Sequence, residues 1–331
     1  MSCQVQSLWE AYKDFFPIGA AVNAETVKTH EELLIKHFNS LTAENEMKFS
    51  SLHPQDGVYE FKDADLIHDF AKRHNMKLRG HTFVWHNQTP EWVFKNEDGT
   101  SVSRDLLLER LKAHVHDVVK RYGNDVYCWD VVNEAVEDKT AQYLRDTKWL
   151  EIIGESYIQK AFEIVNQAAP EAMLFYNDYN ECVPEKREKI YKLVRTLKEN
   201  GVPIHGIGLQ CHWNIFNPSF DEIQRSLEKY ASLGLKIQIT EMDISVFTFE
   251  DQRRDLTEPT AEMIEKQASL YAKAFKLFRE YKDVINGVTL WGVADDKTWL
   301  DDFPVRGRKN WPLLFDVEHN PKEAFYRIVQ F

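Results

Sequence analysis

The stretch Val126-Tyr127-Cys128-Trp129-Asp130-Val131-Val132-Asn133-Glu134 is an apolar, strand-like run that ends in two polar residues. It follows a segment in which apolar residues recur every three or four positions, from Ser103 to Gly123. A serine before such a segment and a glycine after it are common capping residues of a helix. A helix that leads directly into a buried strand is typical of parallel α/β sheets. Residues 103–134 therefore predict one helix–strand unit.

The same alternation extends along the whole chain. Runs with strand character occur at 16–22, 39–45, 78–85, 126–133, 172–178, 205–211, 235–241 and 285–291. Segments of helical period separate them, including one that begins with a capping box at Ser219 and Glu222 and one at 261–281. Eight strands joined by helices predict the α/β class and a single (β/α)8 TIM barrel. Because no linker, low-complexity tract or repeat interrupts the series, residues 1–331 are assigned to one domain.

Composition and charge restrict the class of protein. The 331 residues include 41 basic and 53 acidic side chains, a formal net charge of −12, and 43% are hydrophobic. This composition excludes a disordered chain, and the negative charge disfavours nucleic acid and membranes as partners. No window approaches the ~18 apolar residues of a membrane-spanning helix, and residues 1–10 lack the features of a secretory signal. We therefore expect a cytoplasmic protein, and the sequence leaves its oligomeric state open.

Polar and aromatic residues follow the carboxyl ends of the predicted strands. In chain order these residues are Glu44, Asn45, Lys48, His81, Trp85, Asn133, Glu134, Tyr179, Gln210, His212, Glu241, Asp243 and Trp291, with Trp299 beyond the last strand. Because the carboxyl ends of all strands in a barrel surround one mouth, we expect these side chains to line one cleft. Amides and carboxylates bind hydroxyl groups, and tryptophan rings cover the apolar faces of sugars. The cleft therefore suits a neutral carbohydrate.

Glu134 and Glu241 are the natural pair of carboxyl groups for bond cleavage. Each follows an apolar strand, at nearly opposite positions around the mouth. Retaining glycoside hydrolysis needs a carboxylic acid and a carboxylate about 5–5.5 Å apart. A single glutamate at a strand end is more often solvated or ion-paired, and His81 and His212 are equally compatible with packed core histidines. The combination of these residues favours the catalytic interpretation.

Several longer segments carry a resemblance to a known family. Residues 79–92, which contain Arg79-Gly80-His81-Thr82-Phe83-Val84-Trp85-His86-Asn87, and the segments Trp129-Asp130-Val131-Val132-Asn133-Glu134-Ala135 and Ile239-Thr240-Glu241-Met242-Asp243-Ile244 closely resemble the motifs of family 10 glycoside hydrolases, the endo-1,4-β-xylanases. Segments 41–48, 176–180, 208–213 and 289–292 resemble further motifs in the same order. The resemblance extends over nearly the whole chain.

The resemblance implies a role for each residue of the predicted cleft. Glu134 would be the acid/base and Glu241 the nucleophile, held by His212 with Asp243 behind it. Asn133 would contact the 2-hydroxyl of the sugar that is cleaved. The xylose units on the non-reducing side would be bound by Glu44, Asn45 and Lys48, and the cleavage subsite would be surrounded by His81, Trp85, Gln210, Trp291 and Trp299, with Tyr179 stacked on the leaving-group side. The implied partner is xylan or a xylo-oligosaccharide, and a chain without a leader or carbohydrate-binding module is expected to act on short oligomers.

Other classes of function have less support. The spacings of His81 and His86 and of His114 and His116 do not place two ligands on one face, so no metal site is predicted; His114 is interpreted as a packing or surface residue. Gly206-Ile207-Gly208 lacks the third glycine of a dinucleotide motif, and no cofactor is expected. The alternatives are a non-catalytic carbohydrate-binding barrel, which would lack one carboxylate, and a retaining β-1,4-glucanase of the same clan.

Two further groups of residues have simpler interpretations. Four widely spaced cysteines, Cys3, Cys128, Cys182 and Cys211, form no CxxC pair and are interpreted as free thiols, with Cys128 and Cys211 buried in strands. Four acidic residues near Trp299, at positions 295, 296, 301 and 302, show no ligand spacing. They could bind a cation or form a solvated loop, and the lack of ligand spacing favours the solvated loop.

Overall fold

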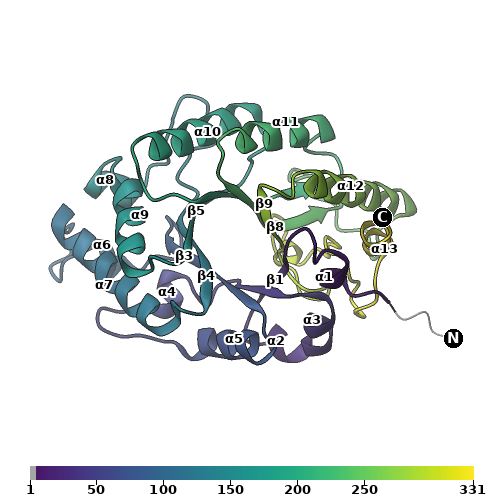
Figure 1. Cartoon of the computed structure of the whole chain (residues 1–331), viewed down its shortest axis with the longest axis horizontal. Coiled ribbons are helices and arrows are strands. Elements are labelled where there is room, and N and C mark those ends of the chain that lie inside the picture. Colours follow the sequence, from purple (N-terminus) through teal and green to yellow (C-terminus); the bar gives the residue numbers. More distant parts are fainter. Residues whose placement is uncertain (1–4) are drawn as a thin grey trace.

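The computed structural model describes residues 5–331, which form a closed barrel of parallel strands inside a ring of helices (Figure 1). The strands are β1 (Ile18–Val22), β2 (Ser40–Ala43), β3 (Lys77–Val84), β4 (Val126–Asn133), β5 (Met173–Asp178), β6 (Gly206–Leu209), β7 (His212–Asn214), β8 (Lys236–Ser245) and β9 (Ile285–Leu290). The predicted single (β/α)8 barrel is confirmed. That residues 1–331 act as one folding unit stays a prediction.

The order of the strands around the barrel is β1, β2, β3, β4, β5, β6, β8 and β9. Strand β9 pairs with β1, with Val288 opposite Ile18, so the sheet has no free edge. The sixth predicted strand, 205–211, is shorter in the structure because Cys211 adopts a left-handed backbone with φ of 58°. The chain resumes as the short strand β7, which pairs with the end of β8. This break turns the residues after Cys211 toward the carboxyl end of β8.

Helices cover the outside of the barrel. They are α1 (Leu8–Ala11), α2 (Thr26–Thr29), α3 (Glu31–His37), α4 (Phe49–Leu52), α5 (Lys62–Arg73), α6 (Glu91–Phe94), α7 (Arg104–Tyr122), α8 (Lys148–Ile153), α9 (Tyr157–Ala168), α10 (Pro184–Glu199), α11 (Phe220–Ala231), α12 (Ala261–Glu280) and α13 (Glu323–Val329), with a 3₁₀ turn η1 (Trp299–Asp301). Ser103 caps α7 and Ser219 caps α11, as predicted. The Glu222 carboxylate accepts a hydrogen bond from Arg187 at 2.7 Å, so the side-chain half of the predicted capping box is replaced by an ion pair.

The barrel strands are buried on both faces, as their continuous apolar runs require. Gly80 on β3 faces the Trp129 ring on β4, and a β-carbon at Gly80 would lie 2.0 Å from that ring. Only glycine therefore allows the large indole to fill the space between the sheet and its helices. A second, smaller apolar cluster of Val246, Phe247, Met263 and Trp311 lies beneath the loops that follow β8 and β9.

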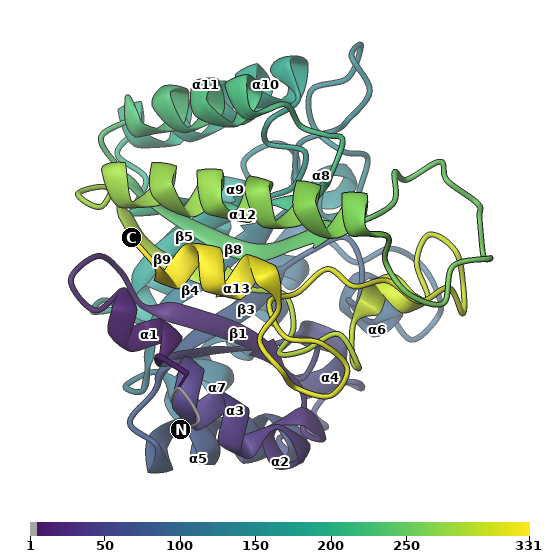
Figure 2. The ribbon, with the colours of Figure 1, turned by 90° about the vertical axis from the view of Figure 1, so that its right-hand side faces the viewer.

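The segments after β8 and β9 project from the carboxyl end of the barrel, as Figure 2 shows. Within residues 5–331, no helix combines the length and the apolar character that a membrane span requires. Cys128, Cys182 and Cys211 are buried free thiols, as predicted for Cys128 and Cys211, whereas Cys3 lies outside the described residues. His114 is buried and its ring stacks on Phe49 with centroids 3.7 Å apart, which confirms a packing role.

Candidate active site

An open cleft of about 930 Å³ lies at the carboxyl ends of the strands. Its lining includes every residue that the sequence analysis assigned to the site, namely Glu44, Asn45, Lys48, His81, Trp85, Asn133, Glu134, Tyr179, Gln210, His212, Glu241, Asp243, Trp291 and Trp299. These residues come from all parts of the chain, and the barrel topology brings them together. The predicted grouping of these side chains into one cleft is therefore confirmed, while the role of each one stays a prediction.

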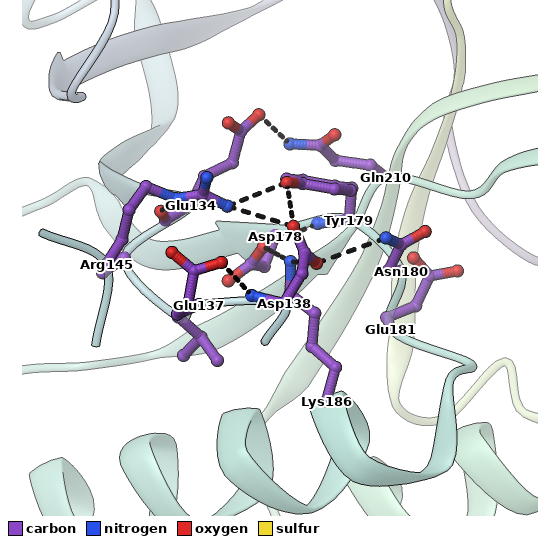
Figure 3. A network of polar contacts seen from close by, with 12 residues as sticks. Glu134, Glu137, Asp138, Arg145, Asp178, Tyr179, Asn180, Glu181, Lys186 and Gln210 are labelled. Atoms are coloured by element: carbon purple, nitrogen blue, oxygen red, sulfur yellow. Dashed lines mark hydrogen bonds and ion pairs between the residues drawn. The ribbon is translucent and has the colours of Figure 1, made fainter. Parts of the chain in front are cut away.

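Glu134 immediately follows β4 and has a left-handed backbone with φ of 57°. Its N–H donates to the Asn177 carbonyl oxygen at 2.8 Å, which holds the turn. The carboxylate accepts a hydrogen bond from the Trp85 indole at 2.8 Å. It accepts a second from the Gln210 amide at 3.0 Å (Figure 3). Burial raises the pKa of Glu134, and the charges of Asp178 and Glu241 add to this increase against the two hydrogen bonds. The raised pKa favours the protonated carboxyl group.

Glu241 lies on β8 with only 5% of its surface exposed. Its carboxylate oxygens contact His212 Nε2 at 3.1 Å and accept a hydrogen bond from Asn177 Nδ2 at 2.8 Å. Burial alone would raise the pKa of Glu241, but the hydrogen bond from His212 and the charges of His81 and His212 outweigh it and lower the pKa to about 2. Glu241 is therefore held ionised, whereas the raised pKa of Glu134 in the same cleft favours its protonated form.

His212 lies between two carboxylates. Its Nδ1 is 3.0 Å from Asp243 Oδ2, and the same Asp243 oxygen accepts a hydrogen bond from the Trp299 indole at 2.8 Å. Burial would lower the pKa of His212, but Asp243 and then Glu241 raise it to about 10. The imidazolium therefore supplies a positive charge beside Glu241, with Asp243 behind it at the position expected from the resemblance.

Asn133 connects the surroundings of the two glutamates. Its side-chain oxygen accepts hydrogen bonds from Asn177 at 2.8 Å and from Gln210 at 3.3 Å. Asn177 also binds Glu241, and Gln210 also binds Glu134, so a continuous chain of amides joins the two carboxylates. Because the Asn133 oxygen is occupied, its amide nitrogen is the group available to a substrate.

Charged residues lie at one side of the two glutamates. Lys48 is buried, donates to the Asn45 side-chain oxygen at 2.9 Å, and lies 4.7 Å from the centre of the Trp85 ring. Burial lowers the pKa of Lys48, although Glu241, Glu44 and Glu134 oppose this shift. Burial likewise raises the pKa of Glu44, and Lys48 opposes that shift. These desolvated groups can form strong hydrogen bonds to hydroxyl groups when water leaves the cleft.

Aromatic rings form the walls of the cleft. Trp291 packs edge-on against His81, with ring centroids 5.6 Å apart, and the His81 Nδ1 is fixed 2.8 Å from Asp130. Trp299 stacks on Phe303 at 5.2 Å, and Phe303 contacts Phe249 from the loop after β8. The rim therefore presents flat apolar surfaces next to polar groups, which is the combination that sugar rings need.

Tyr179 also lines the cleft, near Glu134. The Arg145 guanidinium donates to its hydroxyl group at 2.8 Å, and that hydroxyl group donates to Asp138 (Figure 3). The Lys186 ammonium lies 3.6 Å from the ring centre and also binds Asp138 at 2.7 Å. This network fixes the plane of the Tyr179 ring at the cleft.

The comparisons with known proteins agree with this geometry. The sequence model of glycosyl hydrolase family 10 matches residues 7–331 of this chain. The chain belongs to glycosyl hydrolase family 10. It is 56% identical over 329 residues to the endo-1,4-beta-xylanase of Geobacillus stearothermophilus, and the match covers 99% of each chain.

Solved structures of the family are also very similar. The crystal structure of xylanase XynB from Paenibacillus barcinonensis, complexed with a conduramine derivative, has a TM-score of 0.97 and 55% sequence identity, with 99% of each chain covered. A glutamate-to-alanine mutant structure in complex with xylotriose has a TM-score of 0.97 and 56% identity, covering 99% of this chain and 100% of that one.

Some residues of this family 10 site were not predicted from the sequence. Asn177 is the next-to-last residue of β5, so its place near a strand end was a signal that could have identified it. Asp138 and Arg145 lie in the irregular segment between β4 and α8, where no periodicity indicates which side chains face the cleft. Their contribution depends on how that segment folds back on Tyr179.

The interpretation of the acidic residues near Trp299 as a solvated loop is wrong for Asp295. This carboxylate is fully buried, lies 2.7 Å from Lys322 Nζ, and accepts a hydrogen bond from the Leu313 N–H at 2.8 Å. Burial raises the pKa of Asp295 to about 6 even though Lys322 opposes the shift. The buried pair joins the loop after β9 to the start of α13.

Proposed function

We propose that this enzyme is an endo-1,4-β-xylanase that cleaves xylosidic bonds by double displacement with a covalent glycosyl-enzyme intermediate. Two glutamates in one cleft, with pKa values shifted in opposite directions, carry this proposal. Retaining hydrolysis requires one protonated carboxyl group and one carboxylate, and the environments of Glu134 and Glu241 favour these two states.

In the first step, Glu134 donates its proton to the glycosidic oxygen while Glu241 attacks the anomeric carbon. The bond to the leaving sugar breaks and an ester bond to Glu241 forms. The Asn133 amide nitrogen donates to the sugar 2-hydroxyl, an interaction that strengthens as positive charge develops on the ring. The Trp85 and Gln210 hydrogen bonds hold the Glu134 carboxyl group in position.

At the start of the second step, Glu241 is part of a neutral ester and no longer carries a negative charge. The pKa of Glu134 then falls, because the Glu241 charge contributes to raising it in the free enzyme. Glu134 can now take a proton from water, and the resulting hydroxide attacks the anomeric carbon and releases Glu241. The mutual influence of the two carboxyl groups therefore produces the change of role between the steps.

The names of the relatives support xylan as the substrate class, and the xylotriose complex of a 56% identical protein supports binding of short β-1,4-xylo-oligosaccharides. We propose that Glu44, Asn45 and Lys48 bind the non-reducing-side units and that Tyr179 stacks on the leaving-group side. A preference for short oligomers and a cytoplasmic location stay predictions. The non-catalytic alternative required the loss of one carboxylate, and both glutamates lie in the cleft.

The test is hydrolysis of xylotriose, cellotriose and polymeric xylan, with the anomers of the first products followed by NMR. We expect xylotriose to react faster than cellotriose. The first products released should have the β configuration at the new reducing end. Faster cleavage of cellotriose would identify a glucanase, initial α products would contradict double displacement, and a preference for polymer would contradict the oligomer prediction. Glu137→Gln is a matched control for variants of Glu134, since among residues 5–331 the Glu137 carboxylate accepts hydrogen bonds only from the backbone N–H groups of Asp138 and Lys139.

A further inference from the structure

Three residues from distant parts of the chain meet outside the two catalytic glutamates. His30 lies between α2 and α3, Asp296 lies in the loop after β9, and His319 lies in the turn before α13. Each offers one potential ligand atom, and these atoms all lie within 4.8 Å of one another. Asp296 also lines a side pocket next to the main cleft, together with Trp299 and Glu44. The cluster therefore borders the wall that carries Trp299.

The hydrogen bonds of His30 leave its Nε2 free to act as a metal ligand. The Thr29 hydroxyl lies 3.3 Å from the Glu25 carbonyl oxygen and 2.8 Å from His30 Nδ1, so it can donate to the carbonyl and accept from Nδ1. In that arrangement a neutral His30 carries its hydrogen on Nδ1 and directs a lone pair from Nε2 toward Asp296 Oδ1, 2.9 Å away. A lone pair and a carboxylate oxygen at this distance can share one bound cation.

His319 directs a second imidazole at the same carboxylate oxygen. Its Nε2 is 3.5 Å from Asp296 Oδ1, and its ring lies beside that of His30 with centroids 4.3 Å apart. The two imidazole nitrogens and the carboxylate oxygen therefore converge on one small region. A metal ion would bind all three at once, because each group contributes a lone pair to the same centre.

We propose that His30, Asp296 and His319 form a binding site for a divalent transition metal of the zinc type, with the fourth position open to water. Two imidazole nitrogens and one carboxylate oxygen suit Zn²⁺, Co²⁺ or Cu²⁺ rather than the oxygen-seeking Ca²⁺ or Mg²⁺. Tetrahedral zinc with bonds of about 2.0–2.1 Å places its ligand atoms about 3.3 Å apart. The separations of 2.9 and 3.5 Å lie on either side of this value.

The surroundings support the site. His30 is buried with 2% exposure, and the Thr29 hydroxyl fixes its ring, as the outer partners of metal-binding histidines do. His319 is one-third exposed, which gives an ion access from solvent. A bound ion would join the loop of Trp299 to the start of α3 and to the turn before α13, so it would position one cleft wall without touching the substrate.

The test measures metal binding by the full-length purified enzyme after removal of metal by a chelator. We expect one Co²⁺ per chain with the visible absorption of a four-coordinate site, and displacement of Co²⁺ by Zn²⁺. His319→Asn should weaken Zn²⁺ binding by at least about 100-fold, because loss of a partner that merely orients a ligand already costs 10–100-fold. Asparagine also tolerates the left-handed backbone of His319, whose φ is 67°.

The matched control is His116→Gln, which removes a histidine that is 69% exposed and whose ring lies 3.3 Å from the carboxylate of Asp117. This variant should bind Zn²⁺ as the wild type does, and Zn²⁺ should raise the melting temperature of both but not of His319→Asn or Asp296→Asn. The absence of a stoichiometric Co²⁺ spectrum, or unchanged Zn²⁺ binding by His319→Asn, would overturn the proposal. Because the readout is metal binding, these outcomes are independent of the substrate and mechanism proposed above.

Discussion

Asn177 donates a 2.8 Å hydrogen bond to Glu241 from an amide whose orientation is fixed, because its oxygen accepts a 2.7 Å hydrogen bond from Thr240. The second hydrogen of the same amide goes to Asn133. Asn177 is fully buried, so all of its hydrogen-bonding groups are used within the protein. The proposed nucleophile is therefore held by a side chain that has no freedom to turn away.

We expect Asn177→Ala to lower kcat/KM about 10- to 150-fold, since a hydrogen bond to a charged group contributes about 1.5–3 kcal/mol. The pKa of Glu241 should rise at the same time, so the acid limb of the pH profile should move to higher pH. Asn286→Ala is a suitable control, because it removes an amide near the amino end of β9. Equal kinetic effects of the two variants would show that Asn177 acts only through general stability.

The assignment of the two glutamates predicts opposite products when azide rescues their variants. With an aryl xylobioside that has a good leaving group, Glu241→Ala in azide should give the α-azide, because azide enters from the face that the carboxylate vacates. Glu134→Ala should give the β-azide, formed from the glycosyl-enzyme. On an unactivated xylo-oligosaccharide, Glu134→Ala should lose about 10²–10⁴-fold in rate. NMR identifies the anomers, and their reversal would exchange the two roles.

The opposed pKa shifts predict a bell-shaped dependence of kcat/KM on pH. Activity should fall as pH rises through the raised pKa of Glu134, because the proton needed by the leaving group is lost. Activity should also fall toward about pH 2, where the Glu241 carboxylate becomes protonated. Glu134→Gln, measured with an activated leaving group that needs no acid, should lose the basic limb of the profile. If that limb remained, another group would be the acid.

Asp243→Asn should change the pH profile through His212. Asp243 is the main group that raises the pKa of His212, so its neutralisation should lower that pKa. His212 should then lose its positive charge as pH rises but keep it in acid, so the loss of kcat/KM should be larger at pH 7 than at pH 4. The Asn side chain can still accept from the Trp299 indole, so the wall of the cleft is preserved. A uniform loss at all pH values would contradict this mechanism.

His114 predicts a loss of stability in acid. Burial lowers the pKa of His114 well below 6.5, and neither ring nitrogen has a hydrogen-bond partner among residues 5–331. Below about pH 6.5 the unfolded chain binds a proton at this residue that the folded chain does not, so stability falls as pH falls, by up to about 1.4 kcal/mol per pH unit.

The measurement for His114 is denaturant unfolding of His114→Leu between pH 4 and 7. This variant should show a smaller decrease of unfolding free energy with falling pH than the wild type. His116→Gln on the same helix, where the side chain is largely exposed, should keep the wild-type slope. Parallel curves for the wild type and His114→Leu would exclude His114 as a source of acid sensitivity.

Much of this enzyme could be predicted from its sequence, because the barrel strands are continuous apolar runs. Once eight such runs are placed in a closed barrel, their carboxyl ends must meet, and Glu134 and Glu241 follow as members of one cleft. The motif resemblance then supplied expected roles for Trp85, His212 and Trp299. All three line that cleft, and their roles stay predictions.

The rest depends on contacts that no local pattern encodes. The left-handed Cys211 that divides the sixth strand is not a residue type that marks such a turn. Asp295 is buried because Lys322, 27 residues later, reaches it. His30 and Asp296 are 266 residues apart, so spacing rules for metal ligands could not reveal their proximity.

At Glu134, the left-handed backbone makes the stability of the fold and the proposed catalytic activity depend on the same residue in opposite ways. A residue with a β-carbon is strained in that conformation, at a cost of order 1–3 kcal/mol, whereas glycine is not. Selection for stability alone would therefore favour glycine at this position. A Glu134→Gly variant, inactive under the proposed mechanism, is expected to unfold at a higher temperature than the wild type. The presence of glutamate there means that selection for catalytic rate, and not for stability, determines the residue at this position.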